Sequence, residues 1–255
     1  MYVGERTIMD DIKTLNNWIN EAEDGRVVFF GGAGVSTESG IPDFRSQDGL
    51  YNQQYKYPPE MIISHSFFMQ NPKEFYRFYF DRMIPDESIK PNPAHTKLAE
   101  MERIGKLNGV VTQNIDGLHQ AAGSEKVFEL HGSILRNFCM TCHKPYDLQA
   151  LKDARDEDGI PKCPNCGGML KPDVVLYEEP LDNTVMHKAI SAITQADLMI
   201  IAGTSLVVYP AAGLVDYFRG KHIAIINRDP TKQDQKADLC ISQNVGEVFA
   251  QLNFA

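Results

Sequence analysis

The stretch that most constrains the fold of this chain runs from Val27 to Leu50. It opens with four apolar residues, 27–30, and a β-branched and aromatic run of this length predicts a buried strand. The residues at 31–34 are three glycines and an alanine, which let a backbone turn tightly and approach a ligand closely. Ser36 and Thr37 follow and predict the start of a helix whose N–H groups favour a phosphate. The stretch therefore begins like a dinucleotide-binding fold.

The match to the fingerprint of hydride-transferring dehydrogenases is only partial. Gly32-x-Gly34 is present, but Thr37 occupies the third glycine position, and no acidic residue closes a second strand about 20 residues on. The alternative is that the glycine-rich segment 31–34 forms only a structural turn and binds no ligand. Further along, Phe44 stands beside Arg45 after a proline, and we expect a loop in which Phe44 covers a ring and Arg45 faces a phosphate. A surface loop with one core phenylalanine is the other interpretation.

Composition narrows the class of protein. The chain has 255 residues, a net charge of −9 and 43% hydrophobic residues, enough for an ordinary core. This negative net charge argues against a nucleic-acid-binding surface. No apolar run approaches the roughly 20 residues that span a bilayer, and the N-terminus lacks the apolar stretch of a signal peptide. We therefore expect a cytoplasmic location, in which cysteines bind metal or stay free.

Segments that fit strands alternate with segments of helical periodicity, which favours a parallel sheet with right-handed crossovers. The expected fold class is α/β, with aromatic-rich short helices in 47–91 and a solvated excursion at 148–159. Buried strands are expected at 27–30, 107–112, 127–130, 197–202, 222–226 and 238–242. Helices are expected at 10–20, 93–104, 181–195, 211–218 and 245–252.

Polar residues follow two of the expected strands. Gln113, Asn114 and Asp116 come after the second strand, and His131 comes after the third. Ligands bind at the carboxyl ends of the strands in open α/β sheets, so these side chains are candidates for a site. An imidazole there can act as a general base. For His131 and for His119, a hydrogen-bonded core or surface residue is the alternative.

Four of the five cysteines form two pairs, Cys139-x2-Cys142 and Cys163-x2-Cys166, separated by 20 residues. Two such Cys-x2-Cys pairs supply the four ligands of a tetrahedral Zn²⁺ site. Four thiolates leave the metal no open position, so we expect a structural role. A redox role for one pair is the alternative. Cys240 is left over and is expected to be a buried thiol.

Several motifs, taken together and in order, resemble the sirtuin family. They are residues 32–45, 112–119, 131–133 and 203–211, both cysteine pairs, and Asn227. The resemblance covers about residues 25 to 250 and implies a Rossmann-like domain with a smaller zinc-ribbon and helical module. It places 1–46, 92–134 and 173–255 in the large domain. The helical insertion 47–91 and the zinc ribbon 135–172 would form the small domain.

The resemblance also implies a role for each matching residue. The catalytic residues would be His131 as base, with Asn114 and Asp116. The residues contacting NAD would be Ala33, Thr37, Phe44, Arg45, Gln113, Ile115, Asp116, His131, Thr204, Ser205, Asn227, Asn244 and Val245. The edges that hold a substrate peptide would be Val175, Tyr177, Glu179, Val207 and Tyr209. Cys139, Cys142, Cys163 and Cys166 would bind one structural Zn²⁺.

The implied activity is NAD-dependent removal of acetyl groups from lysines in proteins or peptides. NAD would be consumed as a co-substrate, with release of nicotinamide and O-acetyl-ADP-ribose. A monomer that binds neither nucleic acid nor membrane is expected. A mono-ADP-ribosyltransferase with the same NAD site is one alternative, and a non-catalytic NAD sensor or zinc-ribbon interaction module is another.

Two departures from the family pattern concern the substrate. Tyr177-Glu178-Glu179 stands where the family often has Phe-Gly-Glu, so Glu178 adds a negative charge that would favour basic residues flanking the lysine. Tyr79 stands where the subclass that removes succinyl or malonyl groups carries arginine. We therefore expect neutral acyl groups, acetyl first.

Overall fold

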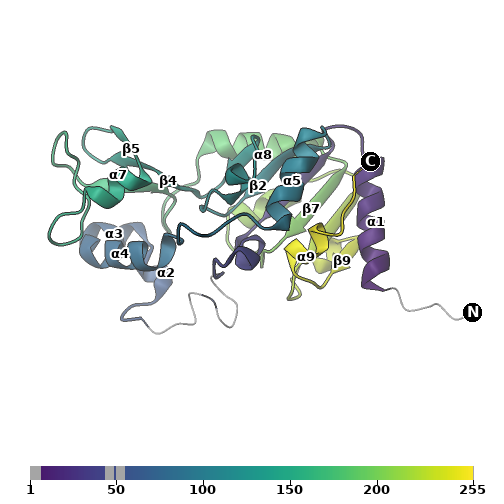
Figure 1. The fold of residues 1–255 in the computed structure, drawn as a ribbon, viewed down its shortest axis with the longest axis horizontal. Helices are drawn as coiled ribbons and strands as arrows, with labels where there is room; N and C mark the ends of the chain where they lie inside the picture. The colour runs from purple at the N-terminus through teal and green to yellow at the C-terminus, as the bar shows by residue number, and fades with distance from the viewer. Residues whose placement is uncertain (1–6, 44–48, 50–54, 255) are drawn as a thin grey trace, which may run out of the picture.

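The computed structural model describes residues 7–43, 49 and 55–254, which form two sheets with their helices. Figure 1 shows the larger sheet at one end of an elongated molecule and the smaller sheet at the other, with strand β4 leading from one to the other. The larger sheet has six strands in the order β3-β2-β1-β7-β8-β9, and every neighbouring pair is parallel. Its strands are β1 (Val27–Gly31), β2 (Leu107–Thr112), β3 (Val127–Glu129), β7 (Leu198–Ala202), β8 (His222–Ile226) and β9 (Leu239–Ile241).

Helices cover both faces of this sheet, which confirms the predicted α/β class. Successive side chains of a strand point to opposite faces. Accordingly, Val27 and Phe29 pack with α1, α5 and α9, whereas Val28 and Phe30 pack with α8 and the 3₁₀ helix η5. These helices are α1 (Ile8–Glu21), α5 (Pro93–Arg103), α6 (Leu118–Ala121), α8 (Asn183–Gln195), η5 (Ala211–Tyr217) and α9 (Val245–Phe249).

The smaller sheet is antiparallel, in the order β5-β4-β6, and α7 packs beside it. Its elements are β4 (Gly132–Cys139), β5 (Pro145–Asp147), α7 (Leu148–Asp153) and β6 (Leu170–Val174). The expectation of a wholly solvated excursion at 148–159 was wrong, because Leu151 of α7 is fully buried in the core of this module.

The aromatic-rich insertion packs on this smaller sheet. Phe68, Phe75 and Tyr76 are buried against Ile134 and Leu170. The insertion contains α2 (Pro59–Ile62), α3 (His65–Gln70), α4 (Pro72–Phe78) and a π-helical turn (Tyr79–Met83). The division of the chain into two domains stays a prediction, and β4 and β6 each run across one of its expected borders.

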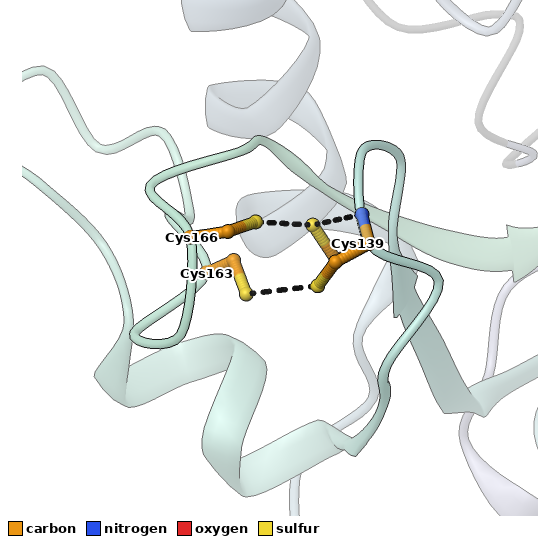
Figure 2. Close-up of side chains that lie close together, drawn as sticks. Cys139, Cys163 and Cys166 are labelled. Carbon is orange, nitrogen blue, oxygen red and sulfur yellow. Dashed lines mark hydrogen bonds between the residues drawn. The ribbon is translucent and has the colours of Figure 1, made fainter.

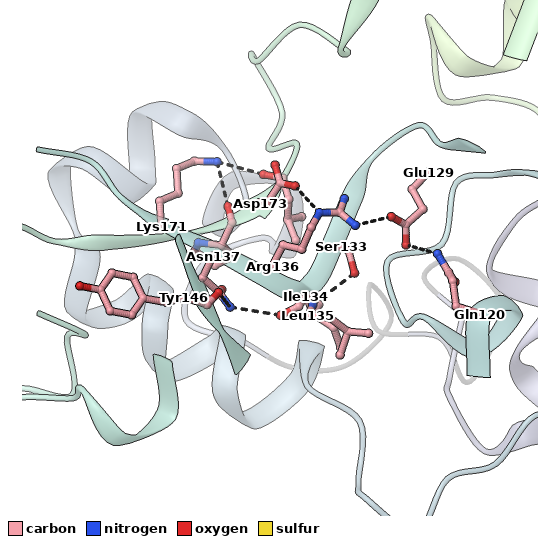
Figure 3. A network of polar contacts seen from close by, with 12 residues as sticks. Gln120, Glu129, Ser133, Ile134, Leu135, Arg136, Asn137, Tyr146, Lys171 and Asp173 are labelled. Carbon is pink, nitrogen blue, oxygen red and sulfur yellow. Dashed lines mark hydrogen bonds and ion pairs between the residues drawn. The ribbon is translucent and has the colours of Figure 1, made fainter. Parts of the chain in front are cut away.

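Arg136, on β4, connects the two sheets (Figure 3). Its Nη1 donates to Glu129 Oε2 at 2.7 Å, and its Nε donates to Asp173 Oδ2 at 2.8 Å. Glu129 ends β3 of the larger sheet, whereas Asp173 lies in β6 of the smaller one. The guanidinium therefore ties the end of β3 in the larger sheet to β4 and β6 of the smaller sheet.

The helix expected after the glycine-rich turn is absent. Residues 33–35 and 37–39 form only two 3₁₀ turns, and Gly40 ends them with a φ of +94°. The hydroxyl of Thr37 donates to Gly34 O at 3.0 Å and caps no helix. Of the helices that the structure describes, none is long and apolar enough to cross a bilayer.

Candidate active site and cysteine cluster

A cavity of about 510 Å³ lies at the carboxyl ends of the larger sheet's strands, where the smaller module meets it. Its shape depends on a close approach of two backbones after β1 and β7. A Cβ built on Gly34 would lie 2.7 Å from Gly203 Cα, and Gly203 has a φ of +58°. Only residues without a side chain fit this approach, which brings the two loops together.

Most of the predicted site residues line this one cavity. Val207 is half exposed and does not line it, although its neighbour Val208 does. Phe44 and Arg45 lie outside the described residues. The predicted residues in the lining are Ala33, Thr37, Gln113, Asn114, Ile115, Asp116, His131, Val175, Tyr177, Glu179, Thr204, Ser205, Tyr209, Asn227, Asn244 and Val245.

Asp116 lies in the wall of the cavity with its carboxylate held by two donors. Ser36 Oγ donates to Oδ2 at 2.7 Å, and the backbone N–H of Leu118 donates to Oδ1 at 2.9 Å. Asn114 Nδ2 donates in turn to Ser36 Oγ at 3.1 Å. Burial raises the pKa of Asp116 above its usual range, and the two donors counteract part of that effect. The result is a fixed carboxylate in a desolvated position.

His95 stands behind Ser36, on α5. Its Nδ1 accepts from the N–H of Asn92 at 3.2 Å, so the proton of the neutral ring lies on Nε2, which faces Ser36 Oγ at 3.5 Å. Burial lowers the pKa of His95 to about 4, which keeps the ring neutral at pH 7. This arrangement orients the Ser36 hydroxyl toward Asp116.

His131 is oriented as a base. Its Nδ1–H donates to the carbonyl oxygen of Gln113 at 3.0 Å, which leaves Nε2 as the unprotonated nitrogen. Burial lowers the pKa of His131, and the hydrogen bond to Gln113 opposes that shift in part. A neutral imidazole whose free nitrogen can accept a proton is what a general base requires at pH 7.

A second set of polar contacts connects the ends of β2, β7 and β8. Gln113 Nε2 donates to Thr204 Oγ1 at 3.0 Å. Thr204 N donates to Asn227 Oδ1, and Asn227 Nδ2 donates to Thr204 O, both at 3.0 Å. These contacts hold Gln113, Thr204 and Asn227 together in the lining of the cavity.

The segment 174–179 forms the opposite wall and is tied to the helical insertion. Tyr177 N donates to Ile63 O, and His65 N donates to Tyr177 O, each at 3.0 Å. Glu179 lines the cavity, but its carboxylate is engaged within the protein. Lys171 Nζ donates to one oxygen at 3.1 Å, and His65 Nδ1 donates to the other at 2.8 Å.

The four paired cysteines converge in the smaller module (Figure 2). Their sulfur atoms all lie within 4.8 Å of one another, with Cys139 and Cys166 at 3.4 Å and Cys142 and Cys163 at 3.7 Å. Zn–S bonds of about 2.3 Å in a tetrahedron separate the sulfurs by about 3.8 Å. All four thiols are free. The donor set therefore fits one Zn²⁺ with no position left for substrate.

The sequence did not reveal the roles of Ser36 and Lys171, and the prediction for Cys240 was wrong. Ser36 was expected to begin a helix and instead donates to Asp116. Lys171 had no expected role, although a lysine with a side chain only 9% exposed marks a buried ion pair. Cys240 was expected to be buried and is exposed, because the edge strand β9 turns it outward.

The fold and the cavity define a nucleotide-binding α/β protein with an accessory cysteine cluster. A model of the Sir2 family matches residues 32–210. The chain belongs to the Sir2 family.

Relatives and solved structures match almost the whole chain. An "NAD-dependent protein deacetylase" of Clostridium perfringens is 55% identical over 248 residues, 96% of this chain and 99% of that one. A protein of the same name from Staphylococcus aureus is 41% identical over 245 residues, 95% of this chain and 98% of that one. A Sir2 structure with a deacetylated p53 peptide and 3′-O-acetyl-ADP-ribose has a TM-score of 0.85 at 38% identity, covering 94% of this chain and 96% of that one.

Proposed function

We propose that this chain is an NAD-dependent protein lysine deacetylase, which consumes NAD and releases nicotinamide and O-acetyl-ADP-ribose. The observation that carries the proposal is the convergence of Asp116, Asn114 and the free Nε2 of His131 on one cavity. Relatives of 41 to 55% identity bear the name of this activity. Solved relatives contain an acetylated peptide, NAD, or the products.

The carboxylate of Asp116 would accept a hydrogen bond from the nicotinamide carboxamide, beside Ile115. Its two internal donors fix its position, and a fixed partner orients the leaving group before the glycosidic bond breaks. Asn114 would position the nicotinamide ribose. Thr204, Ser205, Asn227 and the residues 244–245 would hold the adenosine side.

The reaction joins the acetyl oxygen of the substrate lysine to C1′ of the nicotinamide ribose as nicotinamide leaves. His131 would then accept a proton from a ribose hydroxyl through Nε2, and that hydroxyl would attack the former amide carbon. Water completes the release of lysine and of O-acetyl-ADP-ribose. No hydride moves, which agrees with the incomplete dehydrogenase fingerprint at residues 32–37.

The substrate peptide would add as a strand between the two walls formed by 175–179 and 207–209. One edge of the first wall is already paired, because Tyr177 is bonded to the insertion through both its N–H and its C=O. A neutral acyl chain agrees with Tyr79, which stands where the subclass that removes succinyl or malonyl groups carries arginine and is fully buried. The zinc ion, held by the four cysteines, would stabilise the smaller module.

The experiment that tests this function measures nicotinamide release with three peptides, identical except for acetyl-lysine, succinyl-lysine or unmodified lysine. We expect release to require NAD and the acetyl group, and to be slower with succinyl-lysine. An ADP-ribosyltransferase would release nicotinamide with the unmodified peptide and add mass to it. The monomeric state and the cytoplasmic location stay predictions.

A further inference from the structure

Glu178 adopts a backbone conformation that its residue type rarely takes. Its φ is +76°, in the left-handed region that glycine populates and that bulkier residues avoid. The sequence pattern of the family often has glycine at this position, so the backbone keeps the glycine conformation while the chain carries a carboxylate. The side chain lies in the wall of the cavity, and the residue is exposed.

The adjacent Glu179 does not contribute a free charge to that wall. One of its oxygens accepts from His65, and the other accepts from Lys171 Nζ and from the N–H of Leu176. The side chain of Lys171 is 9% exposed and that of Glu179 is 19% exposed, so this pair is withdrawn from solvent. Glu179 is therefore a structural member of the wall and is unavailable to a substrate cation.

The carboxylate of Glu178, unlike that of Glu179, is exposed and is not part of an ion pair among the described residues. Among the residues that the structure describes, no cation lies within ion-pair distance of its carboxylate. Its Oε2 accepts from the N–H of Ser66 at 2.8 Å, which holds the side chain in place. Hydrogen bonding to the side chain and then to the backbone N–H of Ser66 lowers the pKa of Glu178, so the group is ionised at neutral pH.

The cations that line the cavity have partners of their own. The guanidinium of Arg82 lies 5.8 Å from the centroid of the Tyr55 ring. Arg228 Nε lies 3.6 Å from a carboxylate oxygen of Asp229. The fixed carboxylate of Glu178 is therefore the anion of the 175–179 wall that remains open to a cation of the substrate.

Resting on the deacetylase function proposed above, we propose that Glu178 is a specificity-determining residue that selects acetyl-lysines with lysine or arginine nearby in the sequence. A peptide that pairs with the 175–179 wall as a strand advances about 3.3 Å per residue. Long basic side chains within two residues of the acetyl-lysine can therefore reach the Glu178 carboxylate. The preferred substrates are basic segments of proteins.

The test compares kcat/KM for acetylated peptides that carry lysine, glutamine or glutamate at one flanking position, scanned over two residues on each side. An exposed ion pair is weak, so we expect the lysine peptide to exceed the glutamate peptide about two- to fivefold at the best position. This ratio should fall toward one in 0.5 M salt, because salt screens exposed charges.

Variants separate the charge of Glu178 from its hydrogen bond. Glu178→Gln keeps an oxygen that can accept from Ser66, and it should bring the ratio of kcat/KM between the lysine and glutamate peptides to about one. Glu178→Lys should reverse the preference. Glu178→Gly suits the positive φ and serves as a second uncharged variant if Glu178→Gln folds poorly. Glu157→Lys makes the same charge change at an exposed residue outside the cavity and should keep the wild-type ratio.

Two results would overturn the inference. One is a wild-type enzyme that deacetylates all three peptides equally well. The other is a Glu178→Gln or Glu178→Gly variant that slows all three by the same factor, which would make the residue a structural tether. If the wild type turned over none of the peptides, the proposed function itself would fail.

Discussion

The hydroxyl of Ser36 donates to Asp116 Oδ2 across 2.7 Å, and the imidazole of His95 stands behind that hydroxyl. This contact favours the ionised form of a carboxylate that burial would otherwise drive toward protonation. Ser36 is therefore a positioning residue in our account, because it acts on the substrate only through Asp116.

Replacing Ser36 with alanine should weaken the use of NAD. A hydrogen bond to a charged group contributes about 1.5–3 kcal/mol, so kcat/KM for NAD should fall about 10- to 100-fold. The acid limb of the pH–rate profile should also move to higher pH, since the pKa of Asp116 rises further without this donor. Ser39→Ala is the matched control, because Ser39 lies outside the cavity lining and its hydroxyl has no partner in the described part of the chain. An unchanged acid limb in Ser36→Ala would contradict the account.

Replacing His131 with alanine should lower kcat by about 100- to 10,000-fold, the usual contribution of a general base. The dissociation constant for NAD, measured by calorimetry, should change little. Burial lowers the pKa of His131, so the wild-type rate should persist as the pH falls to about 6.5, the usual pKa of histidine, and decline only below it. Loss of NAD binding in step with turnover would instead indicate a misfolded cavity.

His119 predicts an acid sensitivity of the fold. Both of its ring nitrogens are buried without a partner among the residues that the structure describes, beside Phe29 and His95, and burial lowers its pKa to about 3. Between pH 6.5 and that value the unfolded chain binds a proton that the folded chain does not. The free energy of unfolding therefore falls as the pH drops through this window.

Replacing His119 with leucine should remove that sensitivity. Relative to the wild type, the variant should gain about 2 kcal/mol in unfolding free energy between pH 7.5 and pH 5, measured by urea denaturation. The comparison at pH 7.5 is the control, because His119 is neutral in both states there and only packing differs. A constant difference between the two proteins across this range would show that His119 does not cause the acid sensitivity.

The cysteine cluster predicts linked loss of metal and stability. Cys142→Ser should lower bound zinc well below one per chain and reduce the melting temperature, because metal binding and folding of such a module are coupled. Cys240→Ser is the matched control, since this exposed thiol lies outside the cluster and should leave both quantities unchanged. Full zinc occupancy in Cys142→Ser would show that the four thiols do not form the site.

Much of the fold was predictable because the buried parallel strands are continuous apolar runs. Val27–Gly31 and Leu198–Ala202 are buried at every position, and both were expected from sequence. The strand Gly132–Cys139 was not expected, because it belongs to the smaller antiparallel sheet and alternates irregularly between buried and exposed residues. The missing helix after Ser36 shows that a capping residue cannot start a helix where Gly40 ends the turn four residues later.

Most of the residues assigned from the motifs line one cavity, but the motifs did not show how each side chain is used. Glu179 was assigned to an edge that holds a substrate peptide, and its carboxylate binds Lys171 and His65. That pairing joins residues 8 and 114 positions apart, which no local pattern reveals. Likewise, no local pattern in the sequence reveals the hydrogen bond from Ser36 to Asp116, because the two residues are 80 positions apart.

Identification of the products tests the central claim most directly. The wild-type protein, NAD and an acetyl-lysine peptide should yield deacetylated peptide, nicotinamide and O-acetyl-ADP-ribose in equal amounts by mass spectrometry, with no product when NAD is omitted. Free acetate in place of O-acetyl-ADP-ribose, or a peptide that gains ADP-ribose and keeps its acetyl group, would contradict the account.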